Sequence, residues 1–197
     1  MKRIGLFGGS FDPPHLGHML MAQYVLEECE LDEIWFVPVH TPPHKKRESM
    51  STNEERLEML EQSTALEEKF FISTIEFERK GISYTIDTVK QLKKQHPNTH
   101  FYFIIGGDMI ESLHTWKDIE ELLEDTTFIG VQRPGASSQA IYSDRVIQVE
   151  AIQVDLSSTL IRERVKLGKS IAYMVPNGVE SIIRKRGLYG DGEREST

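Results

Sequence analysis

Short apolar runs alternate with longer segments of helical periodicity along nearly the whole chain. The runs at residues 34–37 and 101–105 are continuously apolar, which is typical of strands buried on both faces of a parallel sheet. Between such runs, segments such as residues 16–29 carry apolar residues along one helical stripe, which predicts amphipathic helices. A chain that alternates strand and helix in this way is expected to form β-α-β units.

The same pattern predicts where the other elements lie. Strands are expected at residues 3–7, 34–37, 101–105, 127–131 and 147–154, with a strand pair around 70–77. Helices are expected at residues 16–29, from Thr52 onward with Glu55 completing a capping box, from Tyr84 to near Pro97, at 118–124, from Ser158, and after Pro176 as far as Gly187. A loop is expected around Trp116. Residues 1–189 are predicted to form one doubly wound α/β domain with a parallel sheet, and residues 190–197 a disordered tail.

The composition is that of an ordinary globular protein, since 39% of the 197 residues are hydrophobic and 27% are charged. With 23 Lys and Arg against 31 Asp and Glu, the formal net charge is −8. This balance argues against a broad surface for nucleic acid or for an anionic membrane, because either partner requires a basic field. Anionic small ligands stay open wherever basic residues gather locally.

The sequence also indicates a compartment. Its single cysteine, Cys29, can form no internal disulfide and no cysteine-based zinc site, so a reducing environment is expected. The apolar run at residues 4–7 is shorter than a signal-peptide core of roughly 7 to 15 residues. No stretch approaches the ~20 apolar residues of a membrane span. We therefore expect a cytoplasmic protein that does not act in a membrane.

The turn after the first predicted strand carries the first candidate chemistry. It reads GGSFDPPHLGH over residues 8–18, which matches neither the dinucleotide fingerprint nor the P-loop. Gly8 and Gly9 let the backbone approach an anion closely. His15 and His18 share one face at the positive end of the following helix, where two imidazoles can donate hydrogen bonds to a phosphate. Gly17 between them keeps a side chain out of that approach.

Two other interpretations of the histidine pair stay open. The proline-rich turn could use both side chains only to cap the helix. Two histidines three residues apart can also chelate a metal ion, although no nearby cysteine, H-E-x-x-H pattern or obvious third ligand accompanies them. Phosphate binding is favoured because it also explains the double glycine at the end of a strand.

A second candidate site reads LSSTLIR over residues 156–162. Ser157 or Ser158 can cap a helix here, and Arg162 lies four residues after Ser158 on the same face. A positive side chain near a helix start is suited to phosphate. A serine-rich helix start is also a common structural feature. We therefore interpret this segment as a phosphate site only because the chain also contains the histidine motif.

Together these motifs resemble the nucleotidyltransferase superfamily with its His-x-Gly-His signature, and more closely the bacterial nicotinate-nucleotide adenylyltransferases. The resemblance extends over nearly the whole chain. Its further landmarks are PPHK at 42–45, YTIDT at 84–88, GGD at 106–108, TWK at 115–117 and RPG at 133–135. The resemblance implies a Rossmann-like fold and the synthesis of nicotinate adenine dinucleotide from ATP and nicotinate mononucleotide.

The resemblance also implies roles for individual residues. It assigns catalysis to His15 and His18, and ATP binding to Gly8, Gly9, Ser10, Phe11, His15, His18, Gly106, Asp108, Ser157, Ser158 and Arg162. It assigns nicotinate mononucleotide binding to Lys45, Tyr84, Thr85, Trp116 and Arg133. In this scheme Trp116 stacks on the pyridine ring, N–H groups near Thr85 hold its carboxylate, and Arg133 holds the phosphate. On sequence alone, Trp116 could equally be a core or rim aromatic, and Arg133 a surface charge.

We expect in-line attack of the mononucleotide phosphate on the α-phosphorus of ATP, without a covalent intermediate. No G-x-S-x-G elbow occurs, and Cys29 lies in a predicted helix. Mg²⁺ is expected as a cofactor carried mainly by the ATP phosphates, so no residue is assigned as a metal ligand. The two substrates are the expected partners, with neither nucleic acid nor membrane, and a homodimer is the assembly we consider.

Three competing functions are weighed against this one. Phosphopantetheine and cytidylyl transferases share the phosphate chemistry, but they usually lack the landmarks at Thr85 and Trp116. A class I aminoacyl-tRNA synthetase would need more length, an anticodon-reading domain and a basic surface. A module that only senses nucleotides would be expected to lack one histidine or Arg162, and all three are present.

Overall fold

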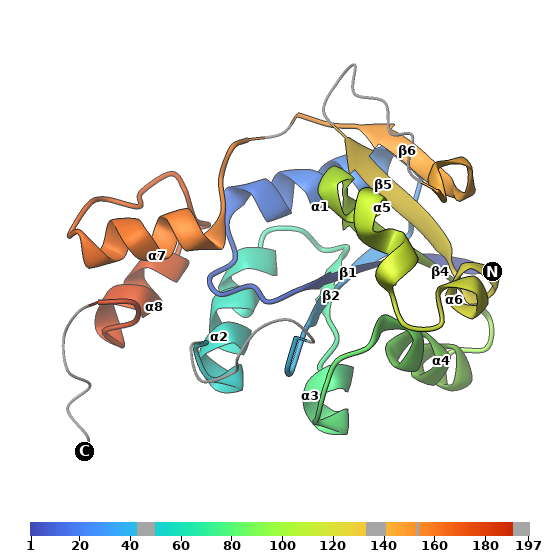
Figure 1. The fold of residues 1–197 in the computed structure, drawn as a ribbon. Helices are drawn as coiled ribbons and strands as arrows, with labels where there is room; N and C mark the ends of the chain where they lie inside the picture. The colour runs from blue at the N-terminus through green and yellow to red at the C-terminus, as the bar shows by residue number, and fades with distance from the viewer. Residues whose placement is uncertain (43–49, 133–140, 153, 191–197) are drawn as a thin grey trace.

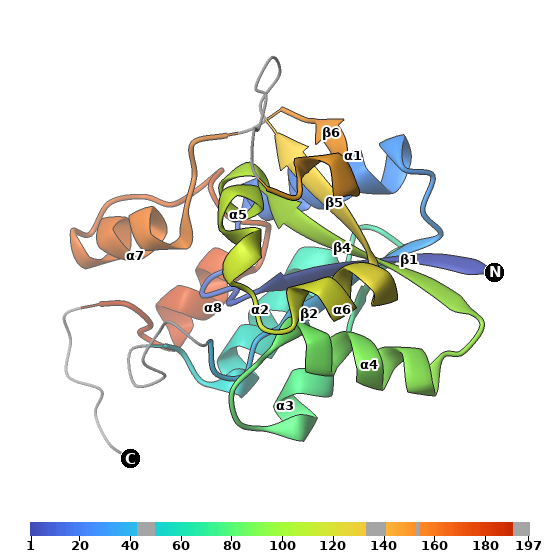
Figure 2. The same cartoon turned by 45° about the vertical axis from the view of Figure 1, so that its right-hand side comes forward.

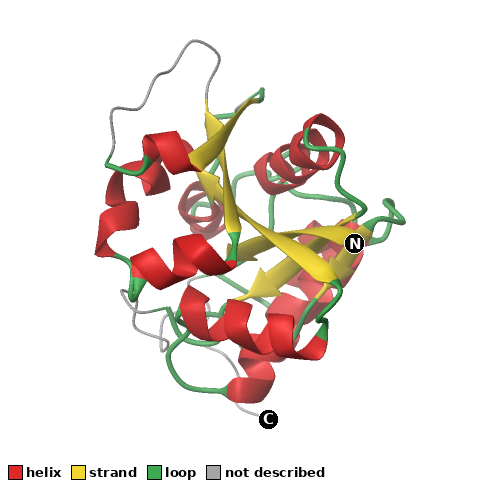
Figure 3. Cartoon of the chain, turned by 90° about the vertical axis from the view of Figure 1, so that its right-hand side faces the viewer, coloured by secondary structure: helices red, strands yellow, loops and turns green. Residues whose placement is uncertain are grey.

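Six parallel strands form a single sheet at the centre of the protein (Figures 1 and 3). The computed structural model describes residues 1–42, 50–132, 141–152 and 154–190, except for the side chain of Asp108. The strand order is β3-β2-β1-β4-β5-β6, and each neighbouring pair is parallel. The chain therefore winds outward in both directions from the β1–β4 pair, which confirms the predicted doubly wound, Rossmann-like fold.

Most elements begin and end close to the predicted residues. The strands are β1 (Lys2–Gly9), β2 (Glu33–Pro38), β3 (Phe70–Ile72), β4 (Thr99–Gly106), β5 (Thr127–Gln132) and β6 (Val146–Glu150). The α-helices are α1 (Leu16–Glu28), α2 (Asn53–Thr64), α3 (Ile75–Arg79), α4 (Thr85–Gln95), α5 (Gly107–Ser112), α6 (Ile119–Asp125), α7 (Ser158–Lys166) and α8 (Val179–Lys185), with 3-10 turns η2 (Leu113–Thr115) and η3 (Ser143–Arg145). The predicted capping box is present, since Thr52 Oγ1 accepts from Glu55 N at 3.2 Å and Thr52 N donates to Glu55 Oε2 at 2.7 Å.

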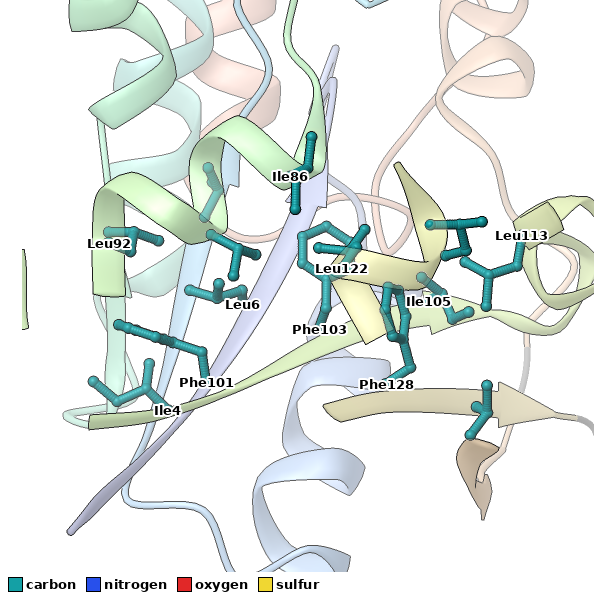
Figure 4. Packing of buried hydrophobic residues seen from close by; sticks show 14 of the residues in the cluster. Ile4, Leu6, Ile86, Leu92, Phe101, Phe103, Ile105, Leu113, Leu122 and Phe128 are labelled. Atoms are coloured by element: carbon teal, nitrogen blue, oxygen red, sulfur yellow. The ribbon is translucent and has the colours of Figure 1, made fainter. Parts of the chain in front are cut away.

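Helices cover both faces of the sheet (Figures 2 and 3). Alternate residues of β1 point to opposite faces, so Ile4 joins the cluster under α4 and α6, whereas Phe7 joins the cluster under α1 and α2. Figure 4 shows the first cluster, where Leu92 of α4 lies near Phe101 of β4 and Leu122 of α6 lies near Phe103 of the same strand. Burying each such side chain contributes roughly 1.5 to 3 kcal/mol, which fixes the helices against the strands.

The C-terminal helices α7 and α8 form a separate small core with α2, at the end of Figure 1 away from the N-terminus. Met59 of α2, Ile161 of α7 and Ile183 of α8 are all buried in this cluster. The cluster anchors the far end of the chain beside a helix of the first half. It thereby holds α7 close to the residues that follow β1, and the two segments are in contact.

The structure corrects the prediction of a strand pair around residues 70–77. Only Phe70–Ile72 forms a strand, and Ile75–Arg79 forms the short helix α3. The apolar residues of this segment fit a two-residue period as well as a helical one, so periodicity over so few residues could not separate the two. The buried side of α3 is supplied by Ile75, which joins the core under α4.

Two further boundaries differ from the prediction. The strand expected at 147–154 ends at Glu150, because its partner β5 ends at Gln132 and the two residues are paired at the end of the ladder. A loop was expected around Trp116, but the residues that lead up to it form α5 and η2. Residues 191–197 of the predicted tail lie outside the described residues. Within the described ranges, no helix has both the length and the apolar character that crossing a membrane requires.

Candidate active site

The histidine turn, defined here as residues 8–18, connects β1 to α1 at the carboxyl edge of the sheet. This is the edge at which doubly wound folds bind ligands. A Cβ at Gly9 would lie 2.9 Å from the Phe11 ring, so the tight path of the backbone requires glycine there. Phe11 itself has φ +48° and is fully buried, with its ring packed on Phe7 and Phe36. Its side chain therefore belongs to the core, and only its backbone can border a ligand.

The two histidines hold each other in place. Their rings are stacked, with centroids 3.6 Å apart and an angle of 25° between the planes. His15 is the N-cap of α1, and its backbone N–H donates to Nδ1 of His18 at 3.1 Å. Because Nδ1 of His18 accepts this hydrogen bond, the proton of the neutral ring is on Nε2 and can be donated outward. The capping interpretation and the ligand-binding interpretation are thus compatible.

Gly17 gives the His15 ring its space. A Cβ at position 17 would lie 3.0 Å from His15 Nδ1, so any larger residue would push against the imidazole. This nitrogen is buried and has no hydrogen-bond partner among the described residues. A buried polar atom without a partner is costly, and such atoms cluster at sites that await a ligand or water.

Both imidazoles are neutral at pH 7. Burial lowers the pKa of His15 to about 4. Burial, together with the neighbouring His15, lowers the pKa of His18 well below its usual value of 6.5. The pair therefore offers N–H donors without charge, and a positive charge for an anionic ligand has to come from elsewhere.

We expect acidification from pH 7.5 to pH 5 to destabilise the protein through His15. In the unfolded chain this side chain takes up a proton near pH 6.5, whereas in the folded protein it stays neutral until about pH 4. The unfolded state binds more protons in this window, so the free energy of unfolding decreases as the pH is lowered. At pH 5 the decrease from this residue is about 2 kcal/mol. Urea denaturation at the two pH values measures the change.

Two variants isolate the contribution of His15. His15→Gln cannot take up the proton, so it should lose clearly less stability on acidification than the wild type. His100→Gln removes an exposed histidine and should keep the wild-type dependence. If His15→Gln and the wild type lose the same free energy between the two pH values, the folded protein does not hold His15 neutral.

The start of α7 lies directly against the histidine turn. Ser157 is the N-cap, since its Oγ accepts a backbone hydrogen bond within the first turn of the helix. Ser158 Oγ donates to the carbonyl oxygen of Pro13 at 2.8 Å, and Arg162 Nη1 donates to that of Asp12 at 2.8 Å. The structure thus brings together two motifs that lie almost at opposite ends of the chain. The Arg162 guanidinium supplies the positive charge that the neutral histidines do not.

Arg56 is a second cation behind the turn and, unlike Arg162, it is buried; no motif in the sequence pointed to it. Its side chain is on α2 and the residue is 1% exposed. Its Nη1 donates to the carbonyl oxygens of Ser10 and Val39, at 2.9 and 2.7 Å, and its guanidinium lies over the ring of Phe77. These bonds join the ends of β1 and β2, so Arg56 fixes the backbone on which the histidine turn is built.

Three of the residues expected to bind the nicotinate half, Tyr84, Thr85 and Trp116, lie on the face covered by α4 and α6. Tyr84 is the N-cap of α4 and Thr85 its first residue, so the free N–H groups of the first turn are at this position. Trp116 is half-buried and stands edge-on to Phe103. Lys117 Nζ lies 4.5 Å from the centre of the Tyr84 ring, which places the start of α4 beside the Trp116 corner.

Polar side chains of α3 fix the first turns of α4 through hydrogen bonds. Thr88 Oγ1 donates to Glu76 Oε1 at 2.6 Å and accepts from Arg79 Nη2 at 3.0 Å. Glu76 is 5% exposed and Thr88 is 1% exposed. The second threonine of the YTIDT landmark therefore has a structural position, whereas the first, Thr85, lies at the open end of the helix.

Phe103 of β4 connects the two halves of the site. A Cβ at Gly8 would lie 3.1 Å from Phe103 Cζ, and the same ring lies 5.8 Å from the Trp116 ring, centroid to centroid. The histidine turn and the expected nicotinate pocket therefore border one aromatic side chain. Gly106, the N-cap of α5, ends β4 at the same edge of the sheet.

Three predicted site groups cannot be placed. Lys45 and Arg133 lie outside the described residues, as does the side chain of Asp108, whose backbone forms the second residue of α5. Among the described residues, no three His, Cys, Asp or Glu side chains gather in a way that could hold a metal ion. The placed residues thus bring the histidine turn, the start of α7 and the Trp116 corner to one edge of the sheet.

Comparison with known proteins identifies the family. A family model described as cytidylyltransferase-like matches residues 6–164. A probable nicotinate-nucleotide adenylyltransferase of Halalkalibacterium halodurans is 54% identical over 194 residues, which cover 98% of this chain and 94% of the relative. The chain belongs to the nicotinate-nucleotide adenylyltransferase family. Another such relative, from Geobacillus kaustophilus, is 55% identical over 190 residues, covering 96% of this chain and 87% of that one.

Solved structures of other adenylyltransferases have the same fold as this protein. The nicotinic acid mononucleotide adenylyltransferase of Plasmodium falciparum, in complex with NaAD, superimposes with a TM-score of 0.82. The match covers 96% of this chain and 98% of the other at 23% sequence identity. At that identity the similarity establishes the common architecture, and the residue roles rest on the geometry described above.

Proposed function

We propose that the protein transfers the adenylyl group of ATP to nicotinate mononucleotide, giving nicotinate adenine dinucleotide and pyrophosphate. The relatives at 54% and 55% identity carry the name of this activity. The observation that carries the proposal is the contact of α7 with the histidine turn, through the bonds of Arg162 and Ser158 to two successive carbonyls. That contact brings a cation and the start of α7 close to the two imidazoles at the start of α1, a combination that suits a polyphosphate.

In the proposed reaction an oxygen of the mononucleotide phosphate attacks the α-phosphorus of ATP. A new P–O bond forms opposite the bond to the bridging oxygen of the β-phosphate, which breaks as pyrophosphate leaves. His18 donates from Nε2 to a phosphate oxygen, His15 lines the same space, and Arg162 neutralises charge on the triphosphate. Donors fixed where charge develops lower the barrier without reorganisation of solvent. Mg²⁺ enters as part of the substrate, held mainly by the ATP phosphates.

The pyridine half of the acceptor is proposed to bind between the start of α4 and Trp116. N–H groups in the first turn of α4, at Thr85, suit the nicotinate carboxylate, because the positive end of a helix favours an anion. The indole of Trp116 suits the flat ring. Lys45 and Arg133 stay predicted ligands of the acceptor phosphate, and Asp108 a predicted ligand of the nucleotide.

Product analysis tests the reaction and the acceptor together. The protein is incubated with ATP, Mg²⁺ and an equimolar mixture of nicotinate and nicotinamide mononucleotides, and the products are measured by mass spectrometry. Nicotinate adenine dinucleotide with an equal amount of pyrophosphate is expected. Formation of the nicotinamide product alone, or of an adenylylated product only in a parallel incubation with another acceptor such as phosphopantetheine, would reject the proposed substrate. Nucleotide binding without any product would instead indicate a nucleotide sensor.

We expect Trp116→Ala to raise the KM for nicotinate mononucleotide by about 10-fold, because the variant loses ring stacking as well as apolar contact area with the pyridine. The KM for ATP should change little. Steady-state kinetics with each substrate varied in turn measures both constants.

Trp116→Phe is the matched control for this prediction. It keeps an aromatic face and most of the packing on Phe103, so it should recover a large part of the affinity for the mononucleotide. A selective rise in the KM for ATP in Trp116→Ala would contradict the placement of the pyridine ring at this residue.

The cytoplasmic location and the homodimer stay predictions. The location rests on the single cysteine, which fits a reducing compartment. Light scattering after size-exclusion chromatography measures the assembly, and a monomer at working concentration would reject the homodimer.

A further inference from the structure

We propose that Tyr189, at the C-terminal end of the described chain, is a positioning residue for the adenylyl transfer, acting on the histidine turn through Asp12. The inference rests on the proposed function and extends it to a residue that no motif singled out. Tyr189 follows α8 and lies 177 positions from Asp12, yet the two side chains are in direct contact. The contact places Tyr189 directly against the histidine turn.

The Asp12 carboxylate is buried in the histidine turn, with the residue 3% exposed. Its Oδ1 accepts a hydrogen bond from the Tyr189 hydroxyl at 2.7 Å. The backbone N–H of Ser51 lies at 3.3 and 3.4 Å from the two carboxylate oxygens. A buried carboxylate is tolerated only when such donors replace its water. The Tyr189 hydroxyl, which makes the shortest of these bonds, therefore determines where the Asp12 side chain is held.

The hydroxyl of Tyr189 has a defined direction. Ser51 Oγ donates to it at 3.0 Å, which leaves the Tyr189 proton to be donated to Asp12. Burial, followed by the charge of Asp12, raises the pKa of Tyr189 above its usual value. The hydroxyl therefore stays a donor throughout the neutral range.

The local chain path aims the ring at the turn. Leu188 is 1% exposed and is buried in the small core of α2, α7 and α8, so it anchors the segment. Gly187 and Tyr189, on either side of it, both have left-handed backbones, with φ +61° and +62°. A residue other than glycine adopts this conformation only where its surroundings impose it. Here the reversal returns the Tyr189 side chain toward Asp12.

The same turn is held from its other side by α7. The carbonyl of Asp12 accepts from Arg162, and that of Pro13 accepts from Ser158. The Asp12 backbone is thus held by α7, and its side chain by Tyr189. The next residues of the chain lead directly to His15, so a shift of the turn moves the imidazoles relative to the phosphates. A misplacement on the order of 1 Å can cost on the order of 10²-fold in rate.

Tyr189→Phe tests the inference, because it removes only the hydroxyl. We expect kcat to fall by about 10-fold while the KM for nicotinate mononucleotide changes less than about twofold. The thermal midpoint should stay close to that of the wild type. Tyr173→Phe, at a residue that is 94% exposed in the same C-terminal region, is the matched control and should leave kcat unchanged.

A double-mutant cycle with Asp12→Asn tests whether Tyr189 acts through the carboxylate. In the Asp12→Asn background, Tyr189→Phe should lower kcat by less than about twofold, because the group it positions has already been changed. The full loss in both backgrounds would overturn the proposal, as would an unchanged kcat in Tyr189→Phe. A joint change of kcat, both KM values and the thermal midpoint would show a general structural role and also overturn it.

A second variant guards against misfolding. Ser51→Ala removes the hydrogen bond that orients the Tyr189 hydroxyl and should lower kcat severalfold with the KM for the mononucleotide retained. An unchanged kcat in this variant would count against the proposal. Wild-type protein is assayed in parallel, and its failure to form the dinucleotide would reject the proposed function itself rather than the role of Tyr189.

Discussion

His18→Ala is expected to lower kcat by about 10²- to 10³-fold, the loss typical of removing one preorganised donor from a transition state. The His18 ring is held by edge contacts with Phe7 and Phe11 and by stacking on His15. Its Nδ1 is engaged by a backbone N–H, so Nε2 is the donor that is left for a phosphate. Pyrophosphate release at saturating substrates measures kcat directly.

His18→Asn separates the donor from the cap. The asparagine carbonyl oxygen can accept the His15 N–H in place of Nδ1, but no group replaces Nε2. We expect this variant to keep most of the stability of α1 and to be nearly as inactive as His18→Ala. His114→Asn, at an exposed histidine, is the matched control and should retain full turnover. Turnover close to wild type in His18→Asn would mean that His18 only caps the helix.

The fold was largely predictable from the sequence because its strands are apolar on both faces. On β2, Phe36 and Val37 are both buried, although they point to opposite faces of the sheet and belong to different core clusters. That double burial gives the continuous apolar runs that indicate a parallel sheet. The order of the strands across the sheet could not be predicted in this way. It depends on which strands pair, and the periodicity within one strand contains no such information.

The wrong and missing elements are short. The segment containing α3 has only five helical residues, and α5 has six, fewer than two turns in each case. Isolated helices of that length are unstable and form only when tertiary packing supplies the energy. Ile110 of α5 shows this packing, since its side chain fills the space beside Gly130 of β5. Such contacts cannot be read from a local window.

The candidate site was predictable as far as its motifs, and not in its supporting residues. The histidine turn and the start of α7 meet as expected, whereas Tyr189, Arg56 and Glu76 reach the site only through the tertiary structure. A signal existed for Arg56, because it lies three and four residues before Met59 and Leu60, on the buried stripe of α2. A charged residue on such a stripe must have buried partners. Tyr189 offered no comparable signal.

Arg162→Met is expected to lower kcat/KM for ATP by about 10²- to 10³-fold. Among the residues placed at the phosphate site, both histidines are neutral, so the guanidinium is the group there that brings a full positive charge to the triphosphate. The same substitution removes the bond to the Asp12 carbonyl and so loosens the histidine turn. Because the proposed pocket for nicotinate mononucleotide lies at the start of α4 and Trp116, the KM for this substrate should change much less.

Arg162→Lys and Arg164→Met divide this effect into its parts. Lysine keeps the charge but cannot present several N–H groups in a rigid fork, so it should recover only part of the loss. Arg164 lies two residues further along α7, where its guanidinium bonds the carbonyl of Ser170, and Arg164→Met matches the change in net charge away from the site. If Arg162→Met and Arg164→Met have equal effects, net charge rather than a specific contact explains the loss. If only Arg162→Met is impaired, the start of α7 is part of the phosphate site.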